Sequence, residues 1–160
     1  MSATVAAPHL PQPGELAPDF TLPSTSGESV TLSSFRGKQH VLLAFFPLAF
    51  TSTCTAELCS FSDDFDAFAA KDVAVFPVSV DAIPSLKVFR SMHQMTVHLL
   101  SDFKRSVVGS WDLLVADKFH SKRAYVLIDK AGIVRWAFVE ESARNKRENA
   151  ELLQQIAQLG

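Results

Sequence analysis

The most informative pattern in the chain lies in residues 41–66, which read VLLAFFPLAFTSTCTAELCSFSDDFD. The segment begins with an apolar run rich in Val, Leu and Phe, which predicts a buried strand that ends at Pro47. A helix is expected after the following polar loop, because apolar side chains recur at helical spacing at Leu58, Phe61, Phe65 and Phe68. A buried strand that leads into a helix is typical of an α/β domain.

Cys54 stands at the predicted start of this helix. Free backbone N–H groups and the positive end of the helix dipole favour an anion there, so this thiol is expected to lose its proton more easily. The thiolate is the nucleophilic form of cysteine. Taken without its neighbours, the residue is better explained as a small buried hydrophobe.

The neighbours of Cys54 carry a resemblance to a known family. Residues 47–54, PLAFTSTC, match the P-x-x-x-T-x-x-C signature of peroxiredoxins, which are thiol peroxidases built on a thioredoxin fold. Other stretches resemble family landmarks in family order, namely APDFTL at 17–22, Glu57, LLSDF at 99–103 and RAYVLIDKAGIV at 123–134. The sequence is most similar to the bacterioferritin-comigratory (PrxQ) and AhpE-like branches.

The resemblance implies roles for the residues around Cys54, which would be the peroxidatic nucleophile. Pro47 would shield the sulfur from bulk water, and the hydroxyl of Thr51 would orient the peroxide. Arg123 matches the family's distant arginine, whose permanent charge stabilises both thiolate and leaving oxygen. Lys122 is adjacent and would point to the opposite side of a strand, so only one of the two can face the site, and Arg123 is favoured.

The roles of Glu57 and Cys59 stay open between two alternatives each. Glu57 is expected in the first turn of the helix, where it would either suit the dipole or hold Arg123. Cys59 has the PrxQ spacing for a residue that resolves the sulfenic acid, yet the stretch also resembles AhpE-type proteins, in which that role can be absent. On an intact helix the two Cα atoms would lie roughly 8.6 Å apart, so a disulfide would require local unwinding.

The remaining pattern predicts alternating strands and helices. We expect an N-terminal hairpin (20–22 and 29–32), a helical turn (32–37), a strand at 73–80 that bends or leaves the ladder at Pro77, a helix at 83–95, a strand at 97–100, a short helix at 106–114, a hairpin (124–128 and 133–139) and a closing helix at 145–159. Periodicity alone supports an α/β domain. The resemblance implies a thioredoxin-like fold with a central mixed β-sheet, flanking helices and an N-terminal β-hairpin extension.

Length and charge limit the remaining possibilities. The 160 residues fit one domain, predicted at 14–160 after a proline-containing arm at 1–13. A formal net charge of -2 argues against a dedicated nucleic-acid surface, although a local basic patch could form from Lys104, Arg105, Lys118, Lys122 and Arg123. Neither a signal peptide nor a membrane helix is indicated, so a cytoplasmic location is expected.

Other functions fit the sequence less well than a peroxidase. A thioredoxin-like reductase needs C-x-x-C, whereas this chain has C-x-x-x-x-C, and the five histidines have no metal-type spacing with the cysteines. No cofactor or metal is therefore expected. The expected partners are a peroxide substrate, a thioredoxin-like or low-molecular-weight thiol reductant and a second copy in a homodimer. The alternative function is a peroxide sensor or redox-switched binding protein that uses the same cysteine.

Overall fold

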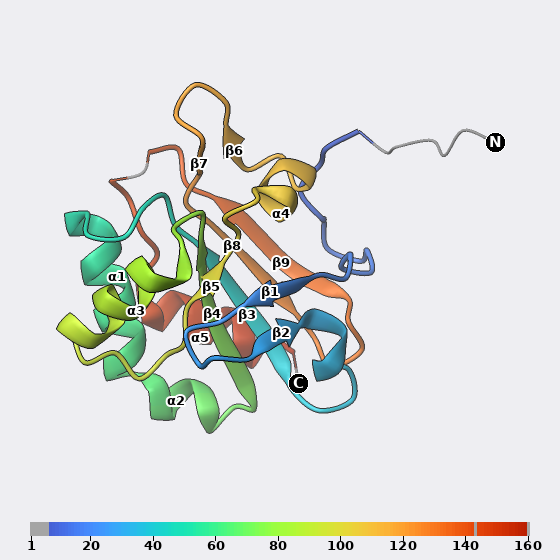
Figure 1. The fold of residues 1–160 in the computed structure, drawn as a ribbon. Helices are drawn as coiled ribbons and strands as arrows, with labels where there is room; N and C mark the ends of the chain where they lie inside the picture. Colours follow the sequence, from blue (N-terminus) through green and yellow to red (C-terminus); the bar gives the residue numbers. More distant parts are fainter. Residues whose placement is uncertain (1–6, 143, 160) are drawn as a thin grey trace.

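The computed structural model describes residues 7–142 and 144–159, whose core is a mixed sheet of five strands in the order β5-β4-β3-β8-β9 (Figure 1). Strands β3, β4 and β5 run parallel, and β8 and β9 are antiparallel to their neighbours. The bounds of the five strands are β3 (His40–Phe45), β4 (Val73–Ser79), β5 (Leu100–Ser101), β8 (Ala124–Ile128) and β9 (Val134–Val139). This arrangement confirms the predicted central mixed sheet.

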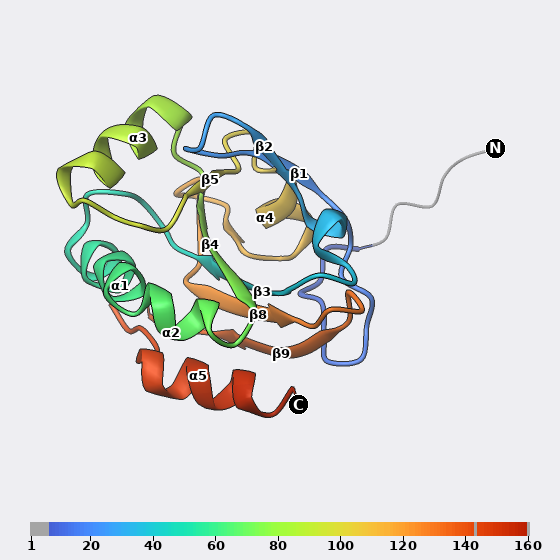
Figure 2. The same cartoon turned by 90° about the horizontal axis from the view of Figure 1, so that it is seen from below.

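Helices cover both faces of the sheet, but unequally (Figure 2). One face carries α1, α2, α3 and α5, while the other is covered by the N-terminal segment, the 3-10 helix η1 and α4. Their bounds are η1 (Leu32–Phe35), α1 (Ser52–Asp63), α2 (Phe65–Ala69), α3 (Ile83–Met92), α4 (Ser106–Ser110) and α5 (Asn149–Ala157). The thioredoxin-like arrangement predicted from the resemblance is thus the one observed.

The central strand β3 is apolar on both faces, which explains its uninterrupted hydrophobic sequence. Leu42 and Ala44 pack in the cluster beneath α1, whereas Leu43 and Phe45 pack in the cluster beneath α4. All four side chains are at most 1% exposed. The strand therefore anchors the loop that follows it to two separate cores.

Two small hairpins lie outside the main sheet. The predicted N-terminal hairpin is present as β1 (Thr21–Pro23) and β2 (Ser29–Thr31). A second hairpin, β6 (Leu114–Val115) and β7 (His120–Ser121), was not predicted. Its strands have two residues each, which is too short for an alternation pattern to be recognised.

Strand β4 keeps its register through Pro77, so the expectation that the chain leaves the ladder after this residue was wrong. Val78 O accepts from Phe46 N on the β3 side, and Ser79 O accepts from Asp102 N on the opposite side. Pro77 is two residues before Ser79, so its backbone groups point to the same side of β4, toward β5. Strand β5 begins to pair with β4 only at Val78. The lack of a backbone N–H at Pro77 therefore costs no ladder hydrogen bond, because no strand in the described part of the chain pairs with β4 on that side at this residue.

Several predicted bounds also differ from the structure. The cysteine helix is interrupted at Asp64, which separates α1 from α2, and the closing helix begins at Asn149 rather than at 145. The strand expected at 97–100 pairs only at Leu100 and Ser101. In the strand, Val97 and Leu99 are already buried before pairing begins, so the apolar pattern extends past the regular hydrogen bonds.

Part of the predicted arm contacts the domain. His9 N donates to Ser110 O at 3.0 Å, and Leu10 packs against the cluster beneath α4. Residues 1–6 of the arm lie outside the described residues, and the boundary near residue 14 stays a prediction. Among the helices that the structure describes, none has the length and apolar character needed to span a membrane.

Candidate active site

The loop between β3 and α1 is fixed at its middle by a carboxylate. Asp81 Oδ2 accepts hydrogen bonds from Ala49 N and from Ser79 Oγ, each at 2.8 Å. Phe50 adopts a left-handed backbone conformation (φ 67°), and its ring lies 4.9 Å from that of Phe89 on α3. Because a left-handed non-glycine residue is unusual, these contacts define the path by which the chain enters α1.

Cys54 occupies the first turn of α1 and is only 1% exposed. The first backbone hydrogen bond of the helix joins Thr55 N to Thr51 O (2.9 Å), so the N–H groups of Ser52, Thr53 and Cys54 precede the intrahelical ladder. The positive end of the helix is therefore adjacent to the sulfur.

Arg123 reaches the same sulfur from the sheet. Its Nη2 lies 2.8 Å from Cys54 Sγ and its Nη1 lies 2.7 Å from Glu57 Oε1. The side chain is buried, and although burial alone lowers the pKa of its guanidinium, Glu57 and Cys54 produce a net rise. The arginine thus places a permanent positive charge against the sulfur.

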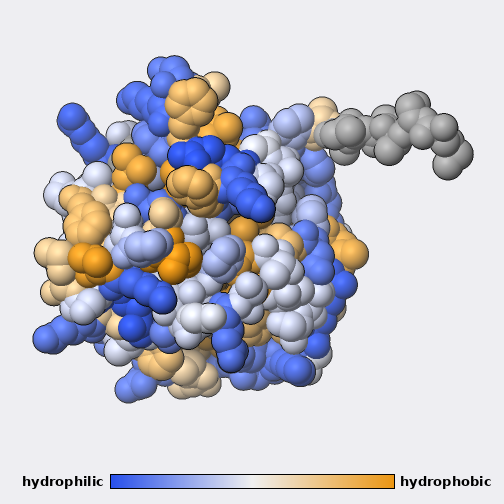
Figure 3. Space-filling view, viewed as in Figure 1, coloured by the Kyte–Doolittle hydropathy of each residue, from blue (hydrophilic) through white to orange (hydrophobic). Residues whose placement is uncertain are grey.

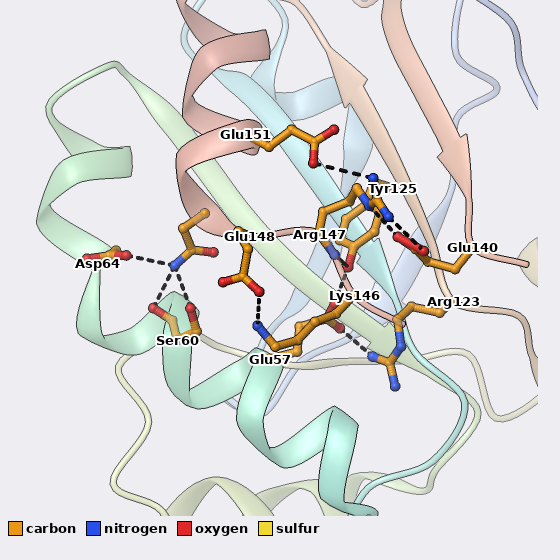
Figure 4. Close-up of polar contacts among 11 residues, drawn as sticks. Glu57, Ser60, Asp64, Arg123, Tyr125, Glu140, Lys146, Arg147, Glu148 and Glu151 are labelled. Carbon is orange, nitrogen blue, oxygen red and sulfur yellow. Dashed lines mark hydrogen bonds and ion pairs between the residues drawn. The ribbon is translucent and has the colours of Figure 1, made fainter. Parts of the chain in front are cut away.

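Glu57 lies in the second turn of α1 rather than in the first, since the helix begins at Ser52 and its first turn holds no acidic residue. The expectation of a first-turn position was therefore wrong, and the carboxylate faces Arg123 instead of the helix start (Figure 4). Burial raises the pKa of the Glu57 carboxyl, while the charge of Arg123 and a hydrogen bond from Tyr125 oppose that rise.

Thr51 and Pro47 flank the loop between β3 and α1. Thr51 is the N-cap residue of α1, but its hydroxyl makes no cap hydrogen bond and donates to Leu48 O at 2.9 Å. Pro47 is buried immediately after β3. Thr51 is exposed, and the role of its hydroxyl toward a peroxide stays a prediction.

Cys59 is half-buried one and a half turns after Cys54, and both residues are free thiols. Its side chain packs against the cluster beneath α1. Burial, with a smaller contribution from the charge of Asp63, raises the pKa of the Cys59 thiol. In this conformation Cys59 is therefore a poorer nucleophile than an exposed cysteine, and its resolving role stays a prediction.

The basic patch that the five basic residues could have formed does not include Arg123, which is buried. Arg105 donates to the carbonyl oxygens of Phe103 and Phe119. Lys122 is exposed next to Arg123, as the alternation of side chains along a strand requires. The five basic residues therefore do not form one surface.

Sequence reasoning missed Tyr125 and Asp81. Tyr125 is fully buried and follows Arg123 by two residues at the start of β8, so both side chains point to the face beneath α1. That spacing was the available signal. Asp81 gave none, because its contact with Ala49 joins residues 32 positions apart. Within the described ranges, no group of His, Cys, Asp and Glu side chains could hold a metal ion.

Comparison with known proteins decides how this geometry is classified. The model of the AhpC/TSA family matches residues 13–137. The chain belongs to the AhpC/TSA family. Alkyl hydroperoxide reductase E of Mycobacterium tuberculosis is 35% identical over 130 residues, which cover 80% of this chain and 85% of that protein. Chloroplastic peroxiredoxin Q of Oryza sativa subsp. japonica is 32% identical over 148 residues, which cover 89% of this chain and 67% of the relative.

Solved structures of the family have the same fold. The reduced 2-Cys peroxiredoxin of Plasmodium vivax superposes with a TM-score of 0.85 at 30% identity, covering 91% of this chain and 80% of that one. Peroxidoxin BcpB of Mycobacterium tuberculosis superposes with a TM-score of 0.83 at 26% identity, covering 95% of this chain and 99% of that one. The chain is a peroxiredoxin, a thiol-dependent peroxidase, and the alternative of a pure sensor is not favoured.

Proposed function

We propose that Cys54 reduces a peroxide, with Arg123, Thr51 and Pro47 as its immediate environment and Glu57 as the residue that holds Arg123. The observation that carries this proposal is the placement of one guanidinium between two buried groups, 2.8 Å from Cys54 Sγ and 2.7 Å from Glu57 Oε1. A fixed cation at that position stabilises both a thiolate and the oxygen anion that leaves it.

The proposed reaction is a two-electron transfer from sulfur to oxygen. The Cys54 thiolate attacks one peroxide oxygen, the S–O bond forms as the O–O bond breaks, and the other oxygen leaves as an alkoxide or hydroxide that takes up a proton. The products are a Cys54 sulfenic acid and an alcohol or water. Hydrogen peroxide and organic hydroperoxides are both candidate substrates, since the step requires only the O–O bond.

A thiol then reduces the sulfenic acid. An attacking thiol forms a disulfide with Cys54 and releases water, and a second thiol restores Cys54 by disulfide exchange. Cys59 would be the first thiol if it resolves, and a thioredoxin-like protein or a low-molecular-weight thiol would supply the others. The free state of both cysteines is compatible with the reducing cytoplasm that we propose as the setting.

We further propose a homodimer that uses the surface beside the active-site loop. Leu48 and Phe50 of the loop and Val88 and Met92 of α3 are all exposed apolar side chains. Figure 3 shows apolar surface on the left of the molecule, where Figure 1 places α1 and α3. Light scattering of the wild type and of Met92→Lys would test it, and a wild-type monomer would contradict it.

The reaction can be tested with two matched cysteine variants. We expect Cys54→Ser to abolish peroxide consumption in the presence of dithiothreitol, because a hydroxyl in this site is not an effective nucleophile. Cys59→Ser should consume peroxide at the wild-type rate in its first turnover. Retention of most activity in Cys54→Ser would exclude the proposed nucleophile. Mass measurement after one equivalent of peroxide would separate a disulfide, which loses two hydrogens, from a sulfenic acid, which gains oxygen.

A further inference from the structure

The hydroxyl of Tyr125 lies at the centre of a chain of buried polar contacts behind Cys54. It donates to Glu57 Oε2 and accepts a hydrogen bond of 2.9 Å from the backbone N of Arg147, as Figure 4 shows. Because the acceptor side of the oxygen is used by Arg147 N, the hydroxyl hydrogen is directed at the carboxylate. Tyr125 is therefore a donor with one defined target.

The carboxylate of Glu57 is held at both oxygens. Oε1 accepts from Arg123 and Oε2 accepts from Tyr125, so the plane of the carboxylate cannot rotate without breaking one of the two bonds. The orientation of this plane sets the position of the guanidinium, whose other nitrogen contacts Cys54 Sγ. The geometry therefore links the phenol to the sulfur through two intermediate side chains.

Packing alone does not account for a tyrosine at this position. The ring of Tyr125 lies 6.2 Å from that of Trp136, in a stacked contact that a phenylalanine would make equally well. The chain contains 13 Phe and a single Tyr, so its aromatic core is otherwise built without buried hydroxyl groups. A buried hydroxyl costs free energy unless it is paired, and here its partner is Glu57.

The segment before α5 keeps the hydroxyl in place. Arg147 forms an ion pair with Glu140, and its guanidinium lies over the ring of Phe138, 4.4 Å from the centroid. These side-chain contacts fix the backbone N–H that faces Tyr125. The hydroxyl of Tyr125 is thus oriented by Arg147, a residue in the segment before α5.

We infer that Tyr125 is a positioning residue for peroxide reduction: its hydroxyl fixes Glu57, and Glu57 holds Arg123 against the sulfur of Cys54. The inference rests on the proposed function of Cys54 and Arg123, and it adds a residue that touches neither the sulfur nor the peroxide. It predicts that the effect of the hydroxyl on the rate disappears when the Glu57 carboxylate is absent.

The first test is a double-mutant cycle on the full chain with hydrogen peroxide as the probe. We expect Tyr125→Phe to lower the second-order rate constant of Cys54 oxidation by about 10-fold to 100-fold, the range of a hydrogen bond to a charged group. In the Glu57→Gln background the same change should alter the rate by less than about twofold, because the two residues act as one unit. Equal losses in both backgrounds, or no loss in either, would overturn the inference.

The second test is the pH dependence of the rate of Cys54 oxidation, which would not change if Tyr125 only stabilised the fold. Three groups act on Glu57, namely Arg123 immediately before β8, Tyr125 on β8 and Lys146 before α5, and Cys54 on the same helix shares the guanidinium of Arg123. Burial raises the pKa of Glu57 and the hydrogen bond from Tyr125 opposes this, so Tyr125→Phe should raise the pKa further. Protonation of Glu57 loosens Arg123, and the acidic limb of the rate profile should move toward neutral pH. An unmoved limb would contradict the inference.

A third measurement keeps the wild-type fold. Because Tyr125 is the only tyrosine, growth with 3-fluorotyrosine labels this position alone. We expect one 19F resonance that shifts in Glu57→Gln and again when one equivalent of hydrogen peroxide oxidises Cys54, whereas Lys122→Gln should leave it in place. A resonance unaffected by Glu57→Gln would refute the linkage even if Tyr125→Phe were unstable. Failure of the proposed function would appear separately, as a wild type that consumes no peroxide.

Discussion

The two ends of α1 differ in their side-chain hydrogen bonds: the start has no side-chain cap, and the end is bound by residues from other elements. At its start, the side chain of Thr51 makes no cap hydrogen bond, and the hydroxyl of Thr55 donates back to Thr51 O at 2.8 Å. At its end, Asn149 Nδ2 donates to Ser60 O, Ser60 Oγ and Asp64 Oδ2 at 2.8 to 2.9 Å. The start of the helix therefore lacks a side-chain cap and is contacted at Cys54 by Arg123, whereas its end is bound to α5 through Asn149.

This difference shows how a single helix can be both a reactive site and a structural element. A strong side-chain cap would have occupied the N–H groups of the first turn. Without it, these groups remain available to a negative charge. The end is bound a second time by Thr96, whose N donates to Ser62 Oγ at 3.0 Å and whose hydroxyl donates to Ser62 O at 3.2 Å. Local opening of the first two turns would therefore not spread to the remainder of the helix.

The largest effect is expected where the start of the helix meets the sheet. Replacing Arg123 with leucine should lower the rate of peroxide reduction by about 100-fold to 1000-fold, because one preorganised charge is lost from the transition state. Stopped-flow kinetics with hydrogen peroxide would measure this. The exposed neighbour offers the control: Lys122→Leu should keep nearly the wild-type rate, and equal losses in the two variants would remove the special role of Arg123.

A smaller effect is expected at the N-cap itself. Thr51→Val removes the hydroxyl that now bonds to Leu48 O, and we expect the rate to fall by about 10-fold, since the peroxide loses one oriented partner. Thr51→Ser keeps the hydroxyl and should retain most of the activity. If the serine variant lost as much activity as the valine variant, the hydroxyl would have no part in the reaction.

The opposite pattern, a loss of stability without a loss of activity, is expected at the end of the helix. Asn149→Ala leaves the oxygen atoms of Ser60 and Asp64 without their donor and should lower the free energy of unfolding by about 1–3 kcal/mol. Urea denaturation would measure the loss. Gln154→Ala, on an exposed position of the same helix α5, is the matched control and should change stability by under about 0.5 kcal/mol. The rate of peroxide reduction should be unchanged in both, and a large fall in Asn149→Ala would mean that the two ends are coupled.

Much of this architecture was predictable, because it follows from local patterns. The apolar run of β3 and the helical spacing after it predicted the strand, the loop and the placement of Cys54 at the start of α1. The proximity of Arg123 came from the resemblance, since 69 residues separate it from Cys54 and no local pattern relates them.

The contacts that support the site were not predictable for the same reason. Asn149 reaches Ser60 across 89 residues, and Tyr125 reaches Glu57 across 68. The alternation of side chains along β8 could have placed Tyr125 on the same face as Arg123, but the identity of its partner depends on how α1 packs over the sheet. Asparagine at position 149 resembles an ordinary residue at a helix start, and only the tertiary structure shows that its amide holds another helix.

The last and smallest effect would show whether the weak start of α1 serves the reaction. Threonine is a poorer helix former than alanine, and the bond from Thr55 Oγ1 to Thr51 O competes with the backbone bond from Thr55 N to the same oxygen, so Thr55→Ala should stabilise the protein by up to about 0.7 kcal/mol. If Cys59 resolves, the first turns must unwind to bring the two sulfurs together, because about 8.6 Å between Cα atoms is beyond disulfide reach. The same substitution should then slow formation of the Cys54–Cys59 disulfide by about threefold, which is the added free energy converted to a rate.

The control for that experiment is Ser91→Ala, an exposed position where alanine gains comparable helix propensity on α3, a helix that holds neither cysteine. Quenched-flow alkylation followed by mass measurement would count disulfide and sulfenic acid at each time. Ser91→Ala should gain stability and leave the disulfide rate at the wild-type value. An unchanged disulfide rate in a stabilised Thr55→Ala protein would show that the start of α1 does not have to open, and an oxygen adduct that persists in the wild type would assign recycling to an external thiol alone.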